Sequence, residues 1–186
     1  MFTHYMAFNP IIWDSTSNIA STISSNVLSG TGSGATAQSI SALSETSSIQ
    51  WTQTSGSGVI GMGHDPYTSS YSEVEFGFHY DASKWKIYES GTKVHEQLGS
   101  STDTLKITIN STGSILYYVN GSLAHTSAVS YDNTKSYYAH ATDFDTQTIT
   151  MDIENADGGT ASGSDFNNAH AHLKPLQVFR RQRDWF

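Results

Sequence analysis

The sequence predicts an all-β protein whose strands form a sandwich of two antiparallel sheets. Apolar and polar residues alternate with a period of two in many short segments, as they do in strands with one buried face. Turn-forming residues separate these segments at intervals of roughly 8 to 12 residues. Only 14% of the 186 residues are charged, whereas average domains carry about 25%. The remainder, rich in Ser, Thr and Gly, suits strands and turns better than exposed helices.

The clearest strand pattern lies in the middle of the chain. Apolar residues alternate with polar ones along Leu105–Ile109 and again along Ile115–Val119. Asn120-Gly121 follows, and this pair favours a type I′ turn because both central residues must take positive φ. We therefore expect a three-stranded meander in which Ser122–Thr126 returns antiparallel to the second strand.

The rest of the chain supplies further strands of the same kind. In Ser72–Asp81, every second residue from Val74 to Tyr80 is apolar, which predicts a face directed into the core. Gly61 and Gly63 interrupt another expected strand, and they indicate that a neighbouring backbone or ring approaches closely. The expected strands outside the meander are Thr22–Leu28, Ala35–Leu43, Ser48–Thr54, Val59–His64, Ser72–Asp81, Lys84–Ser90, Thr92–Leu98, Ser136–Thr142 and Gln147–Glu154.

Composition divides the chain into four parts. We expect an N-terminal arm at residues 1–10, the sandwich at residues 11–156, a Gly- and Ser-rich linker at residues 157–164, and a C-terminal tail at residues 165–186. Residues 1–164 carry five lysines and fifteen acidic residues, for a net charge of −10, whereas the tail carries +2. The body and the tail therefore have opposite charges.

Several classes of function are disfavoured by these numbers. The acidic body disfavours nucleic acid as a partner. Cysteine is absent, which excludes disulfides and thiolate metal sites. We expect no membrane span, because no segment approaches the roughly 18 to 20 apolar residues that one requires. The first ten residues lack the features of a classical signal peptide.

Three segments carry a resemblance to a known family. They read IQWTQTSGSGVIGMGHD, EVEFGFHYDASKWKIYESG and DTLKITINSTGSILYYVNGSLAHTS. The region Trp13–Ala156 resembles the concanavalin A-like sandwich modules, of the SPRY-like kind, found in phage tail or capsid appendages and bacterial surface proteins. The resemblance implies a jelly roll of two antiparallel sheets. It implies no catalytic residues, and it points to carbohydrate or protein binding, or to a spacer role in fibres.

Paired carboxylates are the first candidate for catalysis. Glu73 and Glu75 share one face of an expected strand, and glycoside hydrolases use two carboxylates roughly 5 to 10 Å apart. A solvated sheet face is the simpler interpretation, and we expect it here. His64-Asp65, near Ser69 and Ser70, is a weaker indication of a nucleophile with its base.

Metal sites are a second candidate. Oxygen ligands for calcium are available at Asp132, Asn133, Asp143 and Asp145, and His170 with His172 forms a chelating pair. Turn formation explains the Asp and Asn residues equally well. We expect neither a metal nor any other cofactor.

Aromatic side chains are the strongest functional indication. Rings with polar tips suit sugar stacking or protein contact. The residues that we expect to bind a glycan are Tyr67, Tyr71, Trp85, Tyr88, Tyr131 and Tyr137.

The tail combines large apolar residues with all three arginines of the chain. Trp and Arg are common anchors in protein interfaces, so we expect the tail to dock, either on its own sandwich or on a partner chain. The expected docking residues are Leu176, Phe179, Arg180, Arg181, Arg183, Trp185 and Phe186.

Together these features predict a non-enzymatic structural or recognition protein. We expect a virion protein of a phage, in its surface, fibre or decoration layer, or a protein of an extracellular surface. It would form homo-oligomers through its terminal extensions, contact other assembly proteins and bind carbohydrate. The alternatives are a subunit of an extracellular filament, a glycoside hydrolase or lyase of the same fold, and an intracellular SPRY-like adaptor that binds a short peptide.

Overall fold

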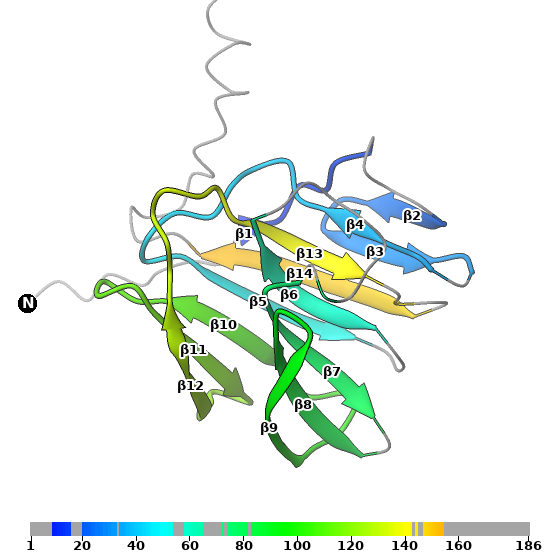
Figure 1. The fold of residues 1–186 in the computed structure, drawn as a ribbon. Helices are drawn as coiled ribbons and strands as arrows, with labels where there is room; N and C mark the ends of the chain where they lie inside the picture. Colours follow the sequence, from blue (N-terminus) through cyan, green and yellow to red (C-terminus); the bar gives the residue numbers. More distant parts are fainter. Residues whose placement is uncertain are drawn as a thin grey trace, which may run out of the picture.

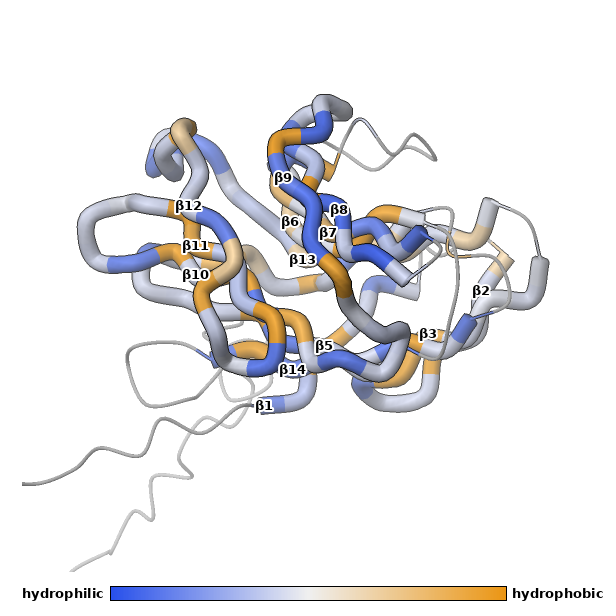
Figure 2. The backbone as a smooth tube through the Cα atoms, turned by 90° about the horizontal axis from the view of Figure 1, so that it is seen from below, coloured by the Kyte–Doolittle hydropathy of each residue, from blue (hydrophilic) through white to orange (hydrophobic). Residues whose placement is uncertain are grey.

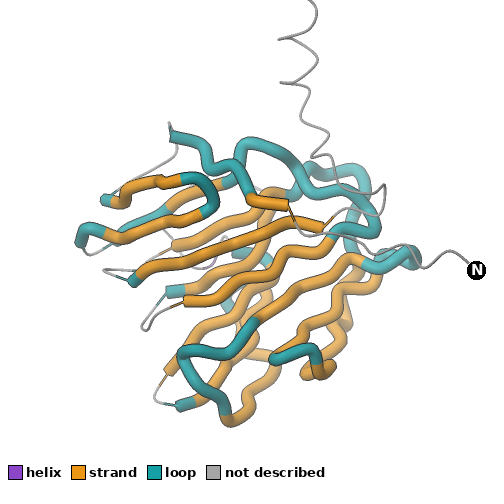
Figure 3. The backbone as a smooth tube through the Cα atoms, turned by 180° about the vertical axis from the view of Figure 1, so that it is seen from behind, coloured by secondary structure: helices purple, strands orange, loops and turns teal. Residues whose placement is uncertain are grey.

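The computed structural model is a sandwich of two antiparallel sheets (Figure 1). It describes residues 9–15, 20–32, 34–53, 58–64, 72, 74–81, 83–142, 144 and 147–154. Strands form most of the drawn backbone, and no α-helix occurs in these ranges (Figure 3). The predicted fold class is confirmed.

The larger sheet has eight strands, in the order β12-β11-β10-β5-β14-β3-β2, with β1 also paired to β14. The last described strand, β14, therefore lies in the interior of this sheet. Its strands are β1 (Asn9–Pro10), β2 (Ser21–Ser24), β3 (Val27–Gly30), β5 (Ser48–Gln53), β10 (Leu105–Ile109), β11 (Ser114–Val119), β12 (Ser122–Ser130) and β14 (Thr148–Glu154).

The smaller sheet has six strands, in the order β4-β13-β6-β7-β8-β9. It begins with β4, which is only two residues long, and ends at the free edge of β9. Its strands are β4 (Ala37–Gln38), β6 (Val59–Gly63), β7 (Phe76–Asp81), β8 (Lys84–Glu89), β9 (Thr92–Leu98) and β13 (Tyr138–Thr142).

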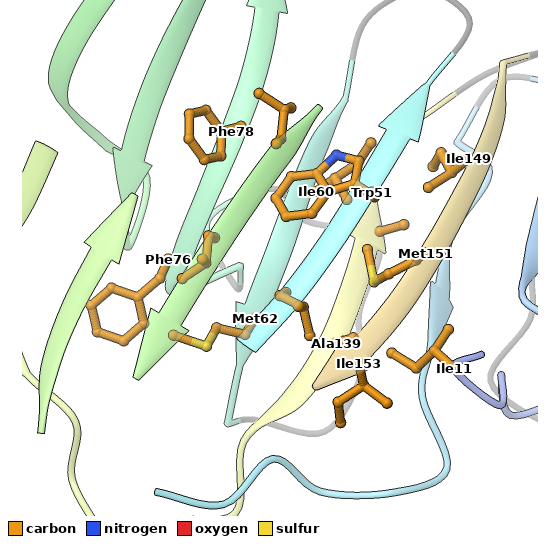
Figure 4. Close-up of a cluster of buried hydrophobic side chains, with 14 of the residues drawn as sticks. Ile11, Trp51, Ile60, Met62, Phe76, Phe78, Ala139, Ile149, Met151 and Ile153 are labelled. Atoms are coloured by element: carbon orange, nitrogen blue, oxygen red, sulfur yellow. The ribbon is translucent and has the colours of Figure 1, made fainter. Parts of the chain in front are cut away.

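The core lies between the sheets and is built from every second residue of the strands. Figure 4 shows side chains from both sheets meeting there, and Figure 2 shows the corresponding mixture of hydrophobic and hydrophilic residues along the backbone. The rings of Trp51 and Phe78 meet edge to face with centroids 5.7 Å apart. Phe78 also contacts Trp85 and Tyr117 in the same manner. Each such buried side chain contributes about 1.5 to 3 kcal/mol through the hydrophobic effect.

The interior of the smaller sheet depends on a pair of glycines. Gly61 lies directly opposite Gly77 in the β6–β7 ladder. A Cβ atom on Gly61 would lie 2.0 Å from the Phe76 carbonyl oxygen and 2.6 Å from the Gly77 Cα. The close backbone approach expected at Gly61 is therefore present.

The predicted meander has the expected turn. Asn120 and Gly121 have φ angles of 50° and 78°, and Val119 pairs with Ser122. The third strand is longer than predicted, because β12 continues beyond Thr126 to Ser130.

Two predicted segments differ most from the structure, and a third, Ser72–Asp81, forms a strand only from Phe76. Thr22–Leu28 is a hairpin and not one strand, because the chain turns at Ser25, which has a φ angle of 59°. Ala35–Leu43 contains only β4 and isolated bridges, one of which joins Leu43 to Tyr137. Polar Ser and Thr residues occur in both segments, and alternation alone does not locate such breaks.

The sandwich begins earlier than predicted. Asn9 pairs with Ile153 and Pro10 with Asp152, so these two residues belong to the sheet and not to the arm. The predicted linker at residues 157–164 and tail at residues 165–186 lie outside the described residues. Within the described part of the chain, no helix is long and apolar enough to cross a membrane.

The free edges of the two sheets lie side by side. The rings of His95 in β9 and His125 in β12 stack with centroids 5.4 Å apart. Behind them, the buried Tyr117 donates a hydrogen bond of 3.2 Å to the Glu89 carboxylate. Polar contacts therefore close this side of the sandwich.

Candidate functional site

A polar groove of about 550 Å³ lies where three loops meet at one end of the sandwich. This volume falls in the usual range for ligand sites, about 300 to 1,000 Å³. The loops are the segment before β5, the turn between β10 and β11, and the segment between β12 and β13. The lining residues are Glu45, Ser111, Thr112, Gly113, Tyr131, Asp132 and Asn133.

Backbone hydrogen bonds hold the three loops together. The Ile109 amide donates to the Ser47 carbonyl at 2.8 Å, which ties the β10 end to the segment before β5. The Tyr131 amide donates to the Gly113 carbonyl at 2.7 Å, which ties the other two loops. The groove is therefore an ordered part of the fold.

One wall is organised by the side chain of Asn110. Its Oδ1 accepts hydrogen bonds from the Thr112 amide at 3.0 Å, the Thr112 hydroxyl at 2.8 Å and the Ser114 amide at 2.8 Å. Gly113 completes the turn with a φ angle of 76°, a conformation that favours glycine. These contacts fix the turn, so Ser111 and Thr112 line the groove before any ligand binds.

The opposite wall contains a carboxylate held in a turn. Asp132 Oδ1 accepts from the Thr134 hydroxyl at 2.6 Å and the Thr134 amide at 3.0 Å. These hydrogen bonds lower the pKa of Asp132 below its ordinary value. The Asn133 amide group donates to Glu45 at 3.4 Å, which connects this wall to the third loop.

Tyr131 is the aromatic residue that lines the groove, and its ring is partly exposed. Burial raises its pKa, and the negative charges of Glu45 and Asp132 raise it further. The phenol therefore remains protonated at neutral pH. Because none of the lining residues is basic, the groove is acidic.

A second layer of polar residues supports Tyr131 from behind. The ring of Tyr137 lies 5.0 Å from that of Tyr131 and 5.6 Å from that of His64. Burial, and then the Glu75 charge, raises the pKa of Tyr137 to about 12. His64 Nδ1 forms a hydrogen-bond contact with Glu75, whose side chain is 15% exposed. This layer fixes the position of the Tyr131 ring.

The six aromatic residues predicted to bind a glycan do not form one surface. Tyr131 lies in the groove. Trp85 and Tyr137 are 0% and 1% exposed, so the prediction is wrong for these two, because a buried ring cannot stack on a sugar. Tyr88 packs edge to face on His79, away from the core. Tyr67 and Tyr71 lie outside the described residues.

The structure describes only some of the residues predicted for catalysis, metal binding and docking. Glu75 is mostly covered and paired with His64, which differs from the solvated face that we expected. Among the described residues, no group of three or more His, Asp or Glu side chains is arranged to hold a metal ion. The remaining candidates lie outside the described residues, and they are Glu73, Asp65, Ser69, Ser70, Asp143, Asp145, His170, His172 and all seven docking residues of the tail.

Sequence reasoning missed Glu45 and the turn residues 111–113 as parts of a site. Ser-Thr-Gly in a hairpin is ordinary turn chemistry and gives no functional signal. For Asp132 and Asn133 the sequence pattern indicates only oxygen ligands for calcium.

The comparisons with known proteins place the fold. No family model matches the chain, and no curated protein matches its sequence. Among solved structures, the chain is similar to the PSpry domain of TRIM65, with 11% identity, a TM-score of 0.60, and coverage of 77% of this chain and 92% of that one. The SPRY domain of human HERC1 matches with 12% identity, a TM-score of 0.56, and coverage of 77% and 98%.

A carbohydrate recognition domain has the same architecture. That of Emp47p matches with 10% identity, a TM-score of 0.52, and coverage of 82% of this chain and 91% of that one. The chain therefore has the concanavalin A-like sandwich fold, of the SPRY-like kind. At these identities the likeness concerns the fold alone.

Proposed function

We propose that this protein is a non-enzymatic recognition module whose acidic groove binds carbohydrate. The observation that carries the proposal is the partly exposed Tyr131 ring in a groove of hydroxyl, amide and carboxylate groups. A sugar presents an apolar face that stacks on such a ring, and hydroxyls that donate to Glu45 and Asp132. The carbohydrate recognition domain of Emp47p, which shares the architecture, supports the choice of ligand class.

The state of Asp132 favours binding over hydrolysis. Glycoside hydrolysis needs one carboxyl group with a raised pKa to protonate the leaving oxygen. The pKa of Asp132 is lowered by its hydrogen bonds with Thr134, so at neutral pH this residue accepts hydrogen bonds and donates none. A hydrolase that uses Asp132 as its general acid is therefore the less favoured alternative.

A glycan array tests the proposal, followed by titration of the best neutral oligosaccharide. We expect Tyr131→Ala to weaken binding by roughly tenfold, because a stacked ring contributes on the order of 1 kcal/mol beyond its burial. The matched control is Tyr118→Ala, which removes a ring covered by Lys106 at 4.7 Å outside the groove. Equal affinity of the Tyr131 variant and the wild type would overturn the proposed site.

We further propose that the module belongs to a larger assembly. The setting would be a virion, in its surface, fibre or decoration layer, or an extracellular surface, with a filament subunit as the alternative. The opposite charges of the body and the tail support attachment through the terminal extensions.

Light scattering measures the mass of the full chain and of a chain ending at Gly163. A full-length oligomer that becomes monomeric on truncation would support assembly through the tail. If both chains are monomeric throughout the light-scattering measurements, the proposal of self-assembly through the tail is wrong.

A further inference from the structure

The described chain ends beside the groove. Glu154, the last residue of β14, pairs with Ser48 at the start of β5, three residues after Glu45. The Ser48 hydroxyl lies 2.9 Å from that of Thr108, near the end of the strand that leads into the turn at residues 111–113. The arrowhead of β14 and the start of β5 lie together in Figure 1. The last described residue therefore lies at the groove end of the sandwich.

The length of that segment suffices to return to the groove. The chain continues for 32 residues after Glu154, and Arg180 follows it by 26. An unstructured chain of that length has a root-mean-square span of about 28 Å. Glu154 and the groove lie at the same end of the sandwich. This span is therefore longer than the distance that the arginines must cover to reach the groove.

The chemistry of the segment complements the groove. All three arginines of the protein lie in its last seven residues, together with Trp185 and Phe186. The groove offers the carboxylates of Glu45 and Asp132, the Tyr131 ring, and no basic side chain. Guanidinium groups bind carboxylates in a two-pronged manner and stack on aromatic rings.

We propose that the C-terminal segment 173–186 docks in the acidic groove of its own chain, with its arginines on Glu45 and Asp132. Tethering gives the segment an effective concentration in the millimolar range, which favours its own groove over that of a neighbour in dilute solution. In a dense assembly the same contact can form between copies by exchange. The proposal does not depend on glycan binding, although a glycan and the segment would compete for one site.

The fluorescence of Trp185 in the full-length protein tests the docking directly. The other three tryptophans, Trp13, Trp51 and Trp85, are at most 3% exposed, so acrylamide quenching reports mainly on Trp185. A Trp185→Phe chain supplies the background to subtract. We expect Trp185 to be protected at low salt.

Three variants of the full chain locate the contact. Neutralising the groove by E45Q with D132N should weaken docking by roughly tenfold, at about threefold for each exposed charge pair, and raise the quenching constant. Substituting the three arginines by glutamine should have the same effect. The matched control is D81N with E96Q, which removes two charges from the sheet β7-β8-β9, outside the groove. This control should leave the quenching constant unchanged.

Each outcome decides the proposal. Full quenching of Trp185 in the wild type at low salt would overturn it. Protection that survives E45Q with D132N would also overturn it, because the segment would then dock elsewhere. Protection that rises with protein concentration would overturn docking in the same chain and show exchange between copies. The quenching experiment contains no sugar. Its result therefore decides the docking proposal even if the glycan array shows no binding.

Discussion

The acidic residues of the sheet β7-β8-β9 and those of the groove differ in their partners. On the sheet, Glu96 accepts from Lys84 at 3.0 Å and from Lys93 at 2.8 Å, and Asp81 pairs with Lys86. Among the described residues, Glu45 and Asp132 form no close ion pair with a lysine and are held by neutral groups such as Thr134 and Asn133. The more distant charge of Lys135 makes only a small contribution to the lowered pKa of Asp132. Asp81 and Glu96 are neutralised by lysines within the molecule, whereas the charge of the groove remains available to a ligand.

Asp103 is held by neutral donors, as the groove carboxylates are, but one of its donors belongs to a buried side chain, so its loss should have the largest effect. It accepts from the Trp85 indole at 2.9 Å, the Ser100 amide at 2.8 Å and the Asn120 side chain at 2.8 Å. We expect Asp103→Ala to cost about 3 kcal/mol, because the indole N–H of a buried tryptophan loses its partner. Urea denaturation measures this cost. Asp103→Asn is the control, since it keeps an acceptor, and an equal loss in both variants would refute the explanation.

Substitution of Asn110 tests whether the groove wall is ordered before any ligand binds. We expect Asn110→Ala to cost about 2 kcal/mol in urea denaturation, because three donors lose one common acceptor. The variant should also weaken ligand binding, since the turn must then be ordered on binding. Asn133→Ala, which removes a single bond of 3.4 Å, serves as the comparison. A similar stability for both variants would show that the wall does not depend on Asn110.

Acid titration separates the two regions further. Hydrogen bonds from Lys93 and Lys84 lower the pKa of Glu96 from 4.5 to about 2. The folded pKa is depressed, so the stabilisation from Glu96 is present above pH 4.5 and is lost as the pH falls from 4.5 to about 2. We expect Glu96→Gln to flatten the loss of stability in this window, as followed by circular dichroism. High salt should reduce the difference between variant and wild type, because these exposed pairs are screened. A difference independent of salt would contradict an ionic origin.

The smallest effect on stability is expected for Glu45→Gln. This exposed residue has one long hydrogen bond, so its denaturation midpoint should match that of the wild type. The same variant should change the affinity of the groove for a cationic probe such as an arginine-containing peptide. A loss of stability comparable to that of Asn110→Ala would show that Glu45 is structural, and the contrast between the two regions would fail.

The strands were predictable because each one contains its own signal. The alternation along Leu105–Ile109 and the Asn120-Gly121 turn depend only on neighbouring residues, and the structure reproduces both. The same reasoning should have removed Trp85 from the glycan site, since it shares a face with the buried Ile87. A ring close to a hairpin is not necessarily exposed.

The groove could not be predicted from local patterns. Its loops are separated in the sequence, with 66 residues between Glu45 and Thr112. They meet because β10 pairs with both β5 and β11, and because β11 pairs with β12. Tyr137 illustrates the same limit. Its burial depends on packing against Phe76, Tyr131 and His64, none of which its own segment contains.

The interior position of β14 also determines when the protein can fold. β14 pairs with β5, with β3 and with β1, which is the first described strand. Such distant pairings make folding slow, because the entropy of closing a long loop is lost before the contacts between its ends stabilise the structure. During synthesis the larger sheet therefore cannot be completed until Glu154 has left the ribosome. The arginines that we propose for the groove emerge after the strands that build it.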